Sequence, residues 1–166
     1  MFGFKKKKEV HEEYKPELIA PCDGKILKVE ELSDPVFSGK VLGDGFAIDP
    51  TSNEVKSPVS GKIIDVQDSL HAYGIETPDG LQILVHIGIN TVSLNGEGFK
   101  AKVKLNQNVK AGDLLAIADF DLIKKKGFEI PVVTLITDID DVKSFKVNGV
   151  GTNARGGETV VLTYEK

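Results

Sequence analysis

A short motif that combines a proline, a glycine and a β-rich run occurs twice in the sequence. Residues 20–29 (APCDGKILKV) are echoed by residues 57–66 (SPVSGKIIDV), and residues 108–115 show the same order of turn and strand. Proline is typical of strand edges, whereas a glycine beside such a run marks a turn or a bulge. The repeat therefore favours a fold built from duplicated, short β-units.

The remainder of the chain is divided by turns in the same way, with 17 glycines and 7 prolines among 166 residues. Further strands are predicted at residues 41–48, 73–77, 82–87, 99–103, 132–136 and 159–164. The best helical candidate, residues 119–126, is long enough for a turn or two. Many short strands with frequent turns predict an all-β fold, an antiparallel β-sandwich or flattened barrel with short helical turns.

The chain divides into a tail and one domain. Residues 1–15 begin with an apolar tip, which four consecutive lysines and then three glutamates follow, and this pattern predicts a flexible, solvated end. An alternative for this tail is a weak contact with anionic lipid through Phe2, Phe4 and the lysines. Residues 16–166 are predicted to form a single domain, because no linker rich in Ser, Gly or Pro divides them.

Composition narrows the class of protein. A net charge of −4 argues against nonspecific nucleic-acid binding, which needs a broad basic surface. No stretch approaches the roughly 20 apolar residues that span a bilayer, and the apolar N-terminal tip is too short for a signal peptide. Cys22 is the single cysteine, so an intrachain disulfide and a cysteine-rich zinc module are both excluded. We therefore expect a cytoplasmic protein.

Two of the three histidines, His71 and His86, lie in the body of the chain. Residues 78–80 (PDG) between them predict a turn, so the two rings are expected to face each other on neighbouring antiparallel strands. His86 lies inside a strongly apolar run, residues 83–89. A lone histidine there would be read as a packed core residue, but a second histidine at hairpin distance makes packing alone a poor explanation.

Phosphoryl transfer suits such a pair. A neutral imidazole, whose ordinary pKa is about 6.5, is a nucleophile near pH 7, and a second imidazole can donate a hydrogen bond to the phosphoryl oxygens. Apolar walls would protect a phosphohistidine from water. Other chemistries fit less well, because the sequence has no Gly-x-Ser-x-Gly elbow, no complete dinucleotide fingerprint, no biotinyl-type Met-Lys-Met and no third zinc ligand clustered with the histidines.

Several ordered segments then resemble one family. Residues 42–48, 57–61, 71–75, 84–92 and 96–99 are similar to the glucose-family enzyme IIA of the bacterial phosphoenolpyruvate-dependent sugar phosphotransferase system. The resemblance extends from about Leu18 to the C-terminus. It implies an antiparallel β-sandwich of the duplicated hybrid motif type, in agreement with the internal repeat.

The resemblance also implies roles for individual residues. His86 would accept a phosphoryl group on Nε2 from the phosphocarrier HPr and donate it to a cysteine of a sugar-specific IIB domain, which serves a membrane IIC permease. His71 would hydrogen-bond the phosphoryl group. The hydroxyl of Ser69 would support the pair, and the backbone carbonyl of Gly88 would hold the other nitrogen of His86.

A partner-docking surface is implied around these histidines. Its apolar ring, which is expected to be exposed, is formed by Val36, Phe37, Leu42, Leu84 and Val92. Phe37 is the strongest candidate for exposure, since it follows Asp34 and Pro35 in a turn-rich stretch. For Leu42 and Leu84 a place in a strand core is an equal alternative.

The charged rim of this surface shows a departure from the family. Asn90 stands where the family usually has aspartate, which together with Asp34 would form a negative rim that receives an arginine from HPr. Asn90 keeps the shape of aspartate and loses its charge. By approximate alignment, Asp138 is also expected near this rim.

Two other functions remain open for the same residues. One is a non-catalytic regulatory protein that binds permeases or kinases through the apolar face according to its phosphorylation state. The other is a zinc site, in which His71 and His86 hold the metal with a carboxylate from a partner. No cofactor is required for the phosphocarrier function, and the choice of sugar is expected to lie with a separate partner.

Overall fold

The structure is a computed structural model that describes residues 13–166. Its strands are β1 (Glu17–Ile19), β2 (Gly24–Lys28), β3 (Asp44–Pro50), β4 (Glu54–Lys56), β5 (Gly61–Val66), β6 (Ala72–Glu76), β7 (Gln82–Ile87), β8 (Phe99–Ala101), β9 (Asn108–Val109), β10 (Leu114–Ala118), β11 (Val132–Ile136), β12 (Ser144–Val147), β13 (Asn153–Ala154) and β14 (Val160–Glu165). The helices are α1 (Pro35–Ser38) and α2 (Phe120–Lys125), with short 3-10 turns η2 (Val29–Glu31), η3 (Thr91–Leu94) and η4 (Ile139–Asp141). None of these helices is long and apolar enough to cross a membrane.

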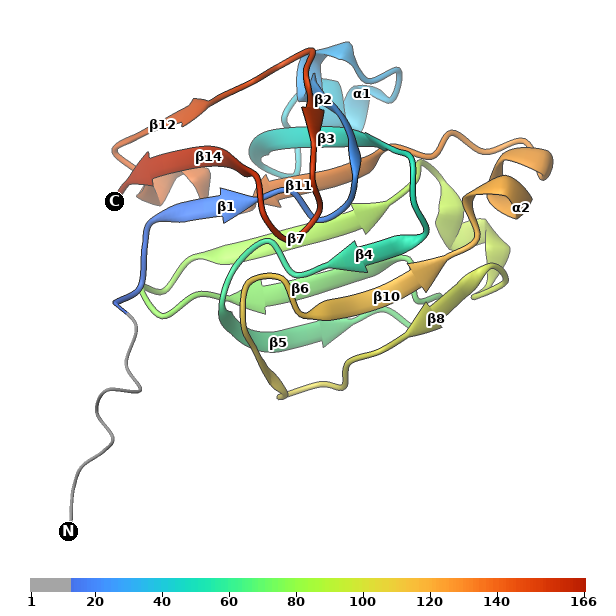
Figure 1. Ribbon diagram of the computed structural model, residues 1–166, viewed down its shortest axis with the longest axis horizontal. Coiled ribbons are helices and arrows are strands. Elements are labelled where there is room, and N and C mark those ends of the chain that lie inside the picture. The colour runs from blue at the N-terminus through green and yellow to red at the C-terminus, as the bar shows by residue number, and fades with distance from the viewer. Residues whose placement is uncertain (1–12) are drawn as a thin grey trace, which may run out of the picture.

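The strands form one large sheet and two small ones. The large sheet has the order β13-β2-β3-β11-β7-β6-β5-β9, and the small sheets have the orders β1-β14-β12 and β4-β10-β8. In Figure 1 the strands β4, β10 and β8 lie over the β6 and β5 side of the large sheet. All strand pairs are antiparallel, which confirms the predicted all-β class.

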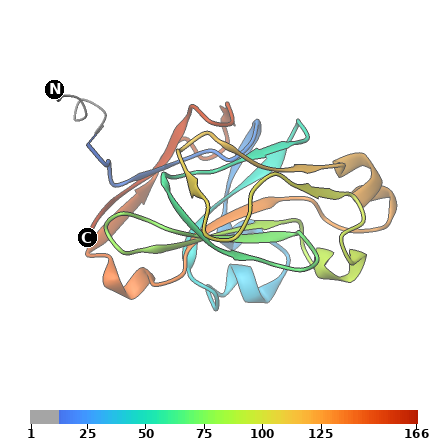
Figure 2. The same cartoon turned by 90° about the horizontal axis from the view of Figure 1, so that it is seen from below.

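Alternating burial in β7 separates the main core from a second apolar cluster. Ile83, Val85 and Ile87 point into the main core between the layers, whereas Leu84 and His86 lie on the opposite face of the sheet. The second cluster on that face contains Val29, Leu32, Phe37, Ala47, Ile89, Val133 and Leu135. Figure 2 shows α1 on this side of the large sheet, away from β8 and β10. The central strand β11 is buried on both faces for this reason.

Register in the β6–β7 hairpin places the two histidines together. Ala72 pairs with His86, and the backbone N–H of Ile87 donates to the carbonyl of His71 at 2.7 Å. The predicted turn closes the hairpin, where Gly80 has a φ of 89° and the N–H of Leu81 donates to Thr77 Oγ1 at 2.8 Å. The expectation that residues 78–80 bring the histidines onto neighbouring strands is confirmed.

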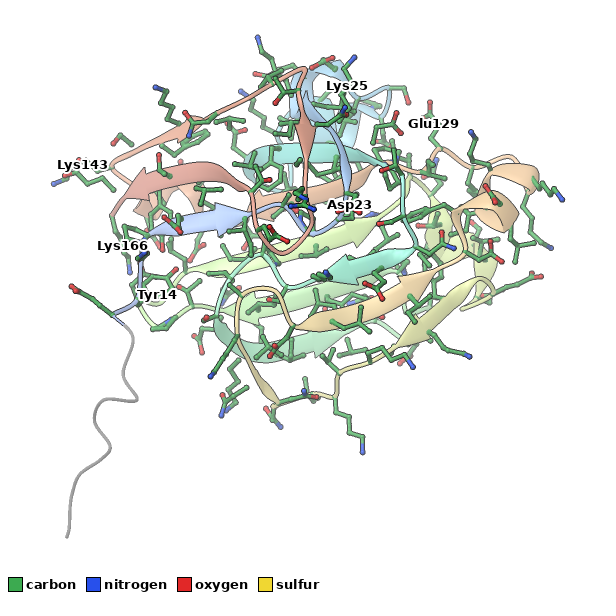
Figure 3. All side chains as sticks on the ribbon, viewed as in Figure 1. Tyr14, Asp23, Lys25, Glu129, Lys143 and Lys166 are labelled. Atoms are coloured by element: carbon green, nitrogen blue, oxygen red, sulfur yellow. The ribbon has the colours of Figure 1, made fainter. Side chains whose placement is uncertain are left out.

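Tyr14, in the segment predicted to be a tail, contacts the body of the protein. Tyr14 is half-buried, and its hydroxyl lies 2.7 Å from the hydroxyl of Tyr164, which in turn donates to Asp79 Oδ2 at 2.6 Å. Figure 3 shows Tyr14 and Lys166 on the same side of the molecule. The predicted boundary between tail and domain at residue 15 stays a prediction. Phe2, Phe4 and the lysines proposed for a lipid contact lie outside the described residues.

Candidate functional site

His86 is held in one tautomer by its own chain. The ring is half-buried near the end of β7, and Nδ1–H donates to the carbonyl of Gly88 at 2.8 Å. Gly88 has a φ of 76°, and a Cβ at this position would lie 2.6 Å from Thr91 Cγ2 and 3.0 Å from the carbonyl oxygen of Glu129. A glycine is therefore required where the chain turns back toward His86. With Nδ1 used as a donor, Nε2 carries the lone pair.

His71 packs edge-on against His86. The ring centroids are 4.9 Å apart at an angle of 84°, and His71 is only 5 % exposed. Its Nδ1 is buried without a hydrogen-bond partner. Ser69 is half-buried two residues before it, and the predicted support from its hydroxyl is not made as a hydrogen bond to this nitrogen.

Phe37 forms a wall of the site, and its predicted exposure is wrong. Its side chain is 4 % exposed, and its ring lies 5.0 Å from that of His86 at 63°. The cause is α1, in which Asp34 Oδ1 accepts the N–H of Val36 at 2.8 Å and Pro35 occupies the first turn. This short helix turns Phe37 inward onto the second apolar cluster.

Burial keeps both imidazoles neutral near pH 7. It lowers the pKa of His86 to about 4, an effect that the neighbouring His71 increases and that the Gly88 carbonyl and Asp34 oppose. Burial likewise lowers the pKa of His71. Nε2 of His86 is therefore an unprotonated nucleophile over the physiological range.

Three of the side chains predicted for the apolar docking ring are exposed. Val36, Leu42 and Val92 are 41 %, 40 % and 51 % exposed, and Leu84 is half-buried against the second cluster. The predicted core alternative for Leu42 is therefore wrong. Val41, the residue before Leu42, is 71 % exposed. The strand predicted to begin at residue 41 begins at Asp44.

Two of the residues predicted for the charged rim, Asp34 and Asn90, each precede a short helical turn. Asp34 is half-buried at the start of α1, and Asn90 is exposed in the left-handed conformation, with a φ of 61°, that asparagine adopts more readily than most residues. Asp138 lies beside the start of β7, where its Oδ1 accepts the N–H of Gln82 at 3.0 Å. His86 is four residues further along that strand, roughly 13 Å away. The expected place of Asp138 near the rim stays a prediction.

The site offers few ligands to a metal ion. Within residues 13–166, no three side chains among His, Cys, Asp and Glu gather closely enough to hold one. His71 and His86 could supply two nitrogen ligands, and any further ligand would have to come from another molecule.

Comparisons with known proteins agree with this arrangement. Residues 16–142 match the family described as phosphoenolpyruvate-dependent sugar phosphotransferase system, EIIA 1. The glucose-specific EIIA component of Buchnera aphidicola is 44 % identical over 149 residues, which cover 90 % of this chain and 91 % of the relative. The corresponding component of Halalkalibacterium halodurans is 39 % identical over 168 residues, covering 99 % and 96 %.

A solved structure extends the agreement to the fold. Glucose permease IIA from Mycoplasma capricolum superposes with a TM-score of 0.81 at 40 % sequence identity, covering 88 % of this chain and 94 % of that one. The family resemblance seen in the sequence and the predicted β fold are both confirmed. The chain belongs to the EIIA 1 family of the phosphoenolpyruvate-dependent sugar phosphotransferase system and is a phosphocarrier of that relay.

Proposed function

We propose that Nε2 of His86 accepts the phosphoryl group from phosphorylated HPr and that a cysteine of a IIB domain then takes it. The observation that carries this proposal is the hydrogen bond from His86 Nδ1 to the Gly88 carbonyl at 2.8 Å. It leaves the Nε2 lone pair as the nucleophile of the ring. The exposed Val36, Leu42 and Val92 supply the apolar surface on which a transient partner would dock.

Two transfers complete the relay. In the first, the bond between phosphorus and the donor histidine breaks as the bond from phosphorus to His86 Nε2 forms. In the second, a cysteine thiolate attacks phosphorus, and the electron pair of the breaking bond returns to Nε2. The His71 ring, 4.9 Å from that of His86, donates a hydrogen bond to a phosphoryl oxygen, which stabilises charge in both transition states.

The first test is phosphorylation by phosphoenolpyruvate, enzyme I and HPr, followed by intact mass measurement. We expect one acid-labile phosphate on the wild type and none on His86→Ala. His86→Ala should keep the circular dichroism spectrum of the wild type, which would separate loss of the acceptor from loss of the fold. A wild type without added phosphate, or a phosphorylated His86→Ala, would overturn the assignment of His86.

For the sugar, we propose glucose. The relatives from Buchnera aphidicola and Halalkalibacterium halodurans carry glucose-specific names, and a glucose-specific EIICBA component of Streptococcus pneumoniae contains a segment 42 % identical to 90 % of this chain. The test is transfer from the phosphorylated protein to IIB domains of glucose and non-glucose permeases. Faster transfer to a non-glucose IIB domain would contradict the proposal.

A further inference from the structure

A groove with an apolar floor lies next to the histidine pair. Its volume is about 420 Å³. The floor is formed by Leu27, Leu32, Ile89, Phe128, Ile130 and Pro131. We call it the Glu129 groove, after the carboxylate at its edge, which Figure 3 shows on the side of the molecule where Lys25 lies.

The edge of the groove is acidic. Glu31, Asp49 and Glu129 line it together with a single cation, Lys124. Among the described residues, no lysine or arginine forms an ion pair with these three carboxylates. Ser33, which is 96 residues from Glu129 in the sequence, donates a hydrogen bond from its Oγ to Glu129 Oε1. This bond holds the carboxylate at the groove. The groove therefore combines an apolar floor with carboxylates that have no partner cation in residues 13–166.

The Glu129 groove shares its wall with the phosphorylation site. Leu32 and Ile89 pack in the same apolar cluster as Phe37, whose ring contacts that of His86. The backbone is also shared, because the N–H of Ile89 donates to the carbonyl of Glu129 at 3.0 Å. A molecule that docks over His86 thus extends naturally onto the groove.

Charge decides what kind of group the groove accepts. A protein that brings a phosphoryl group to His86 carries an anion toward a face that already holds Asp34 and the carboxylates of the groove. Repulsion between like charges opposes this approach unless the donor presents cations beside its phosphoryl group. A lysine or arginine side chain fits both properties of the groove, since its apolar stem covers apolar surface while its charged end reaches a carboxylate.

We propose that the Glu129 groove binds a lysine or arginine side chain of the phosphoryl-donor protein, with the apolar stem along the floor of the groove and the charged end on Glu129. Asn90, which is exposed and neutral, provides no charge on this side of the site. Glu129 provides it instead. This proposal rests on the proposed function, because it requires that a donor protein docks at His86.

The test measures KM and kcat for phosphorylation by phosphorylated HPr. Glu129→Gln should raise KM about fivefold, as expected for a single exposed ion pair, and Glu129→Lys should raise it more because it adds repulsion. In both variants kcat should stay within about twofold of the wild type, since Glu129 does not touch the reacting atoms. The KM of the wild type should also rise more steeply with added salt than that of Glu129→Gln.

Matched controls separate this contact from general charge. Glu165 is an exposed carboxylate at the end of β14, and Glu165→Gln and Glu165→Lys should leave KM unchanged. A donor in which one lysine or arginine is replaced by glutamine should show no further loss with Glu129→Gln if that side chain occupies the groove. Thermal melts of Glu129→Gln, the conservative variant, show that the comparison is made between folded proteins.

The outcomes distinguish this proposal from the function on which it rests. A wild type that takes up no phosphate overturns the proposed function and the groove proposal together. Normal phosphorylation of the wild type, with an unchanged KM in Glu129→Lys, overturns the groove proposal alone. An unchanged KM for HPr combined with slower transfer to a IIB domain would place the acceptor in the groove and would also overturn the proposal.

Discussion

His71 and His86 both have lowered pKa values, yet the Nδ1 atoms of the two rings differ in their hydrogen bonding. Nδ1 of His86 donates to the Gly88 carbonyl, whereas Nδ1 of His71 is buried without a partner. A ring whose Nδ1 proton is held in place has a defined nucleophilic nitrogen, which suits an acceptor. Because Nδ1 of His71 has no hydrogen-bond partner, no contact at that nitrogen fixes the tautomer of the ring.

This difference predicts the effect of His71→Gln. The variant should still be phosphorylated on His86, because the nucleophile and its tautomer are unchanged. Transfer to the IIB domain should be slower by about 10²-fold, since one donor to the developing charge is lost or displaced. Quench-flow measurement of phosphate loss from the phosphorylated variant after addition of a IIB domain checks this. Wild-type transfer rates would show that His71 does not stabilise the phosphoryl group.

Phe37 gives a second prediction at the same scale. Phe37→Ala removes a buried ring that packs 5.0 Å from His86, so water should enter and the pKa of His86 should rise from about 4 toward its ordinary value. The free energy of unfolding should fall by about 3 kcal/mol. NMR titration of the His86 ring and urea unfolding measure the two effects.

Val36→Ala is the matched control for Phe37→Ala. Val36 is the neighbouring residue in α1 and is 41 % exposed, so its truncation should leave both the pKa of His86 and the stability nearly unchanged. If Phe37→Ala and Val36→Ala shift the His86 titration equally, Phe37 is not the wall that excludes water.

Among the elements, those with long apolar runs were predictable and those with a single turn were not. The bounds predicted at 82–87 and 132–136 coincide with β7 and β11, because continuous apolar sequence identifies buried strands. The predicted helix at 119–126 corresponds to α2, which Asp119 caps at Leu122 N. By contrast, α1 has four residues and no periodicity to read, so the inward direction of Phe37 could not be inferred.

The site follows the same division. The histidine pair was predictable, because a local turn at residues 78–80 brings the two strands together. The contact between Ser33 and Glu129 joins residues 96 positions apart on two loops, and no local pattern in the sequence indicates it.

A substitution at Gly88 tests the role of the turn that follows β7. Gly88→Ala must place a side chain at a φ of 76°, where its Cβ would lie 2.6 Å from Thr91 Cγ2. We expect a loss of about 1–3 kcal/mol in the free energy of unfolding and slower phosphorylation, because the carbonyl that orients His86 would shift. Gly127→Ala is the control, since Gly127 has a φ of 94° but nothing within 4 Å of the added Cβ. Equal phosphorylation rates in the two variants would contradict the role of the Gly88 carbonyl.

At the scale of the whole molecule, the main core and the chemistry lie on opposite faces of the large sheet. Ile83, Val85 and Ile87 pack in the main core, so the strand that carries His86 is held by packing on the face opposite to the histidines. The second cluster under α1 then provides a dry surface for the imidazoles. This division places two titratable rings in a partly buried layer, and it therefore links the acceptor site to global stability.

That link predicts a stability that depends on pH through His86. Its pKa is about 4 in the folded protein and about 6.5 in the unfolded chain, so between these values the unfolded chain binds more protons. Stability should fall as the pH drops through 6.5, and the loss should be complete near pH 4. The full shift corresponds to about 3 kcal/mol, which solvent screening of a half-buried ring reduces to about 1–2 kcal/mol.

His86→Gln isolates this contribution, because glutamine keeps a polar side chain that does not titrate. Urea unfolding of the wild type and of His86→Gln at a series of pH values between 7.5 and 4, a range set by the two pKa values, gives the difference. Carboxylates common to both proteins cancel in this difference, so the wild type should lose stability relative to His86→Gln as the pH falls from 6.5. Curves that stay parallel would mean that His86 is as well solvated in the folded protein as in the unfolded chain. An acceptor held in that way would be protonated in half of the molecules near pH 6.5, and phosphorylation would then have to compete with the proton for Nε2.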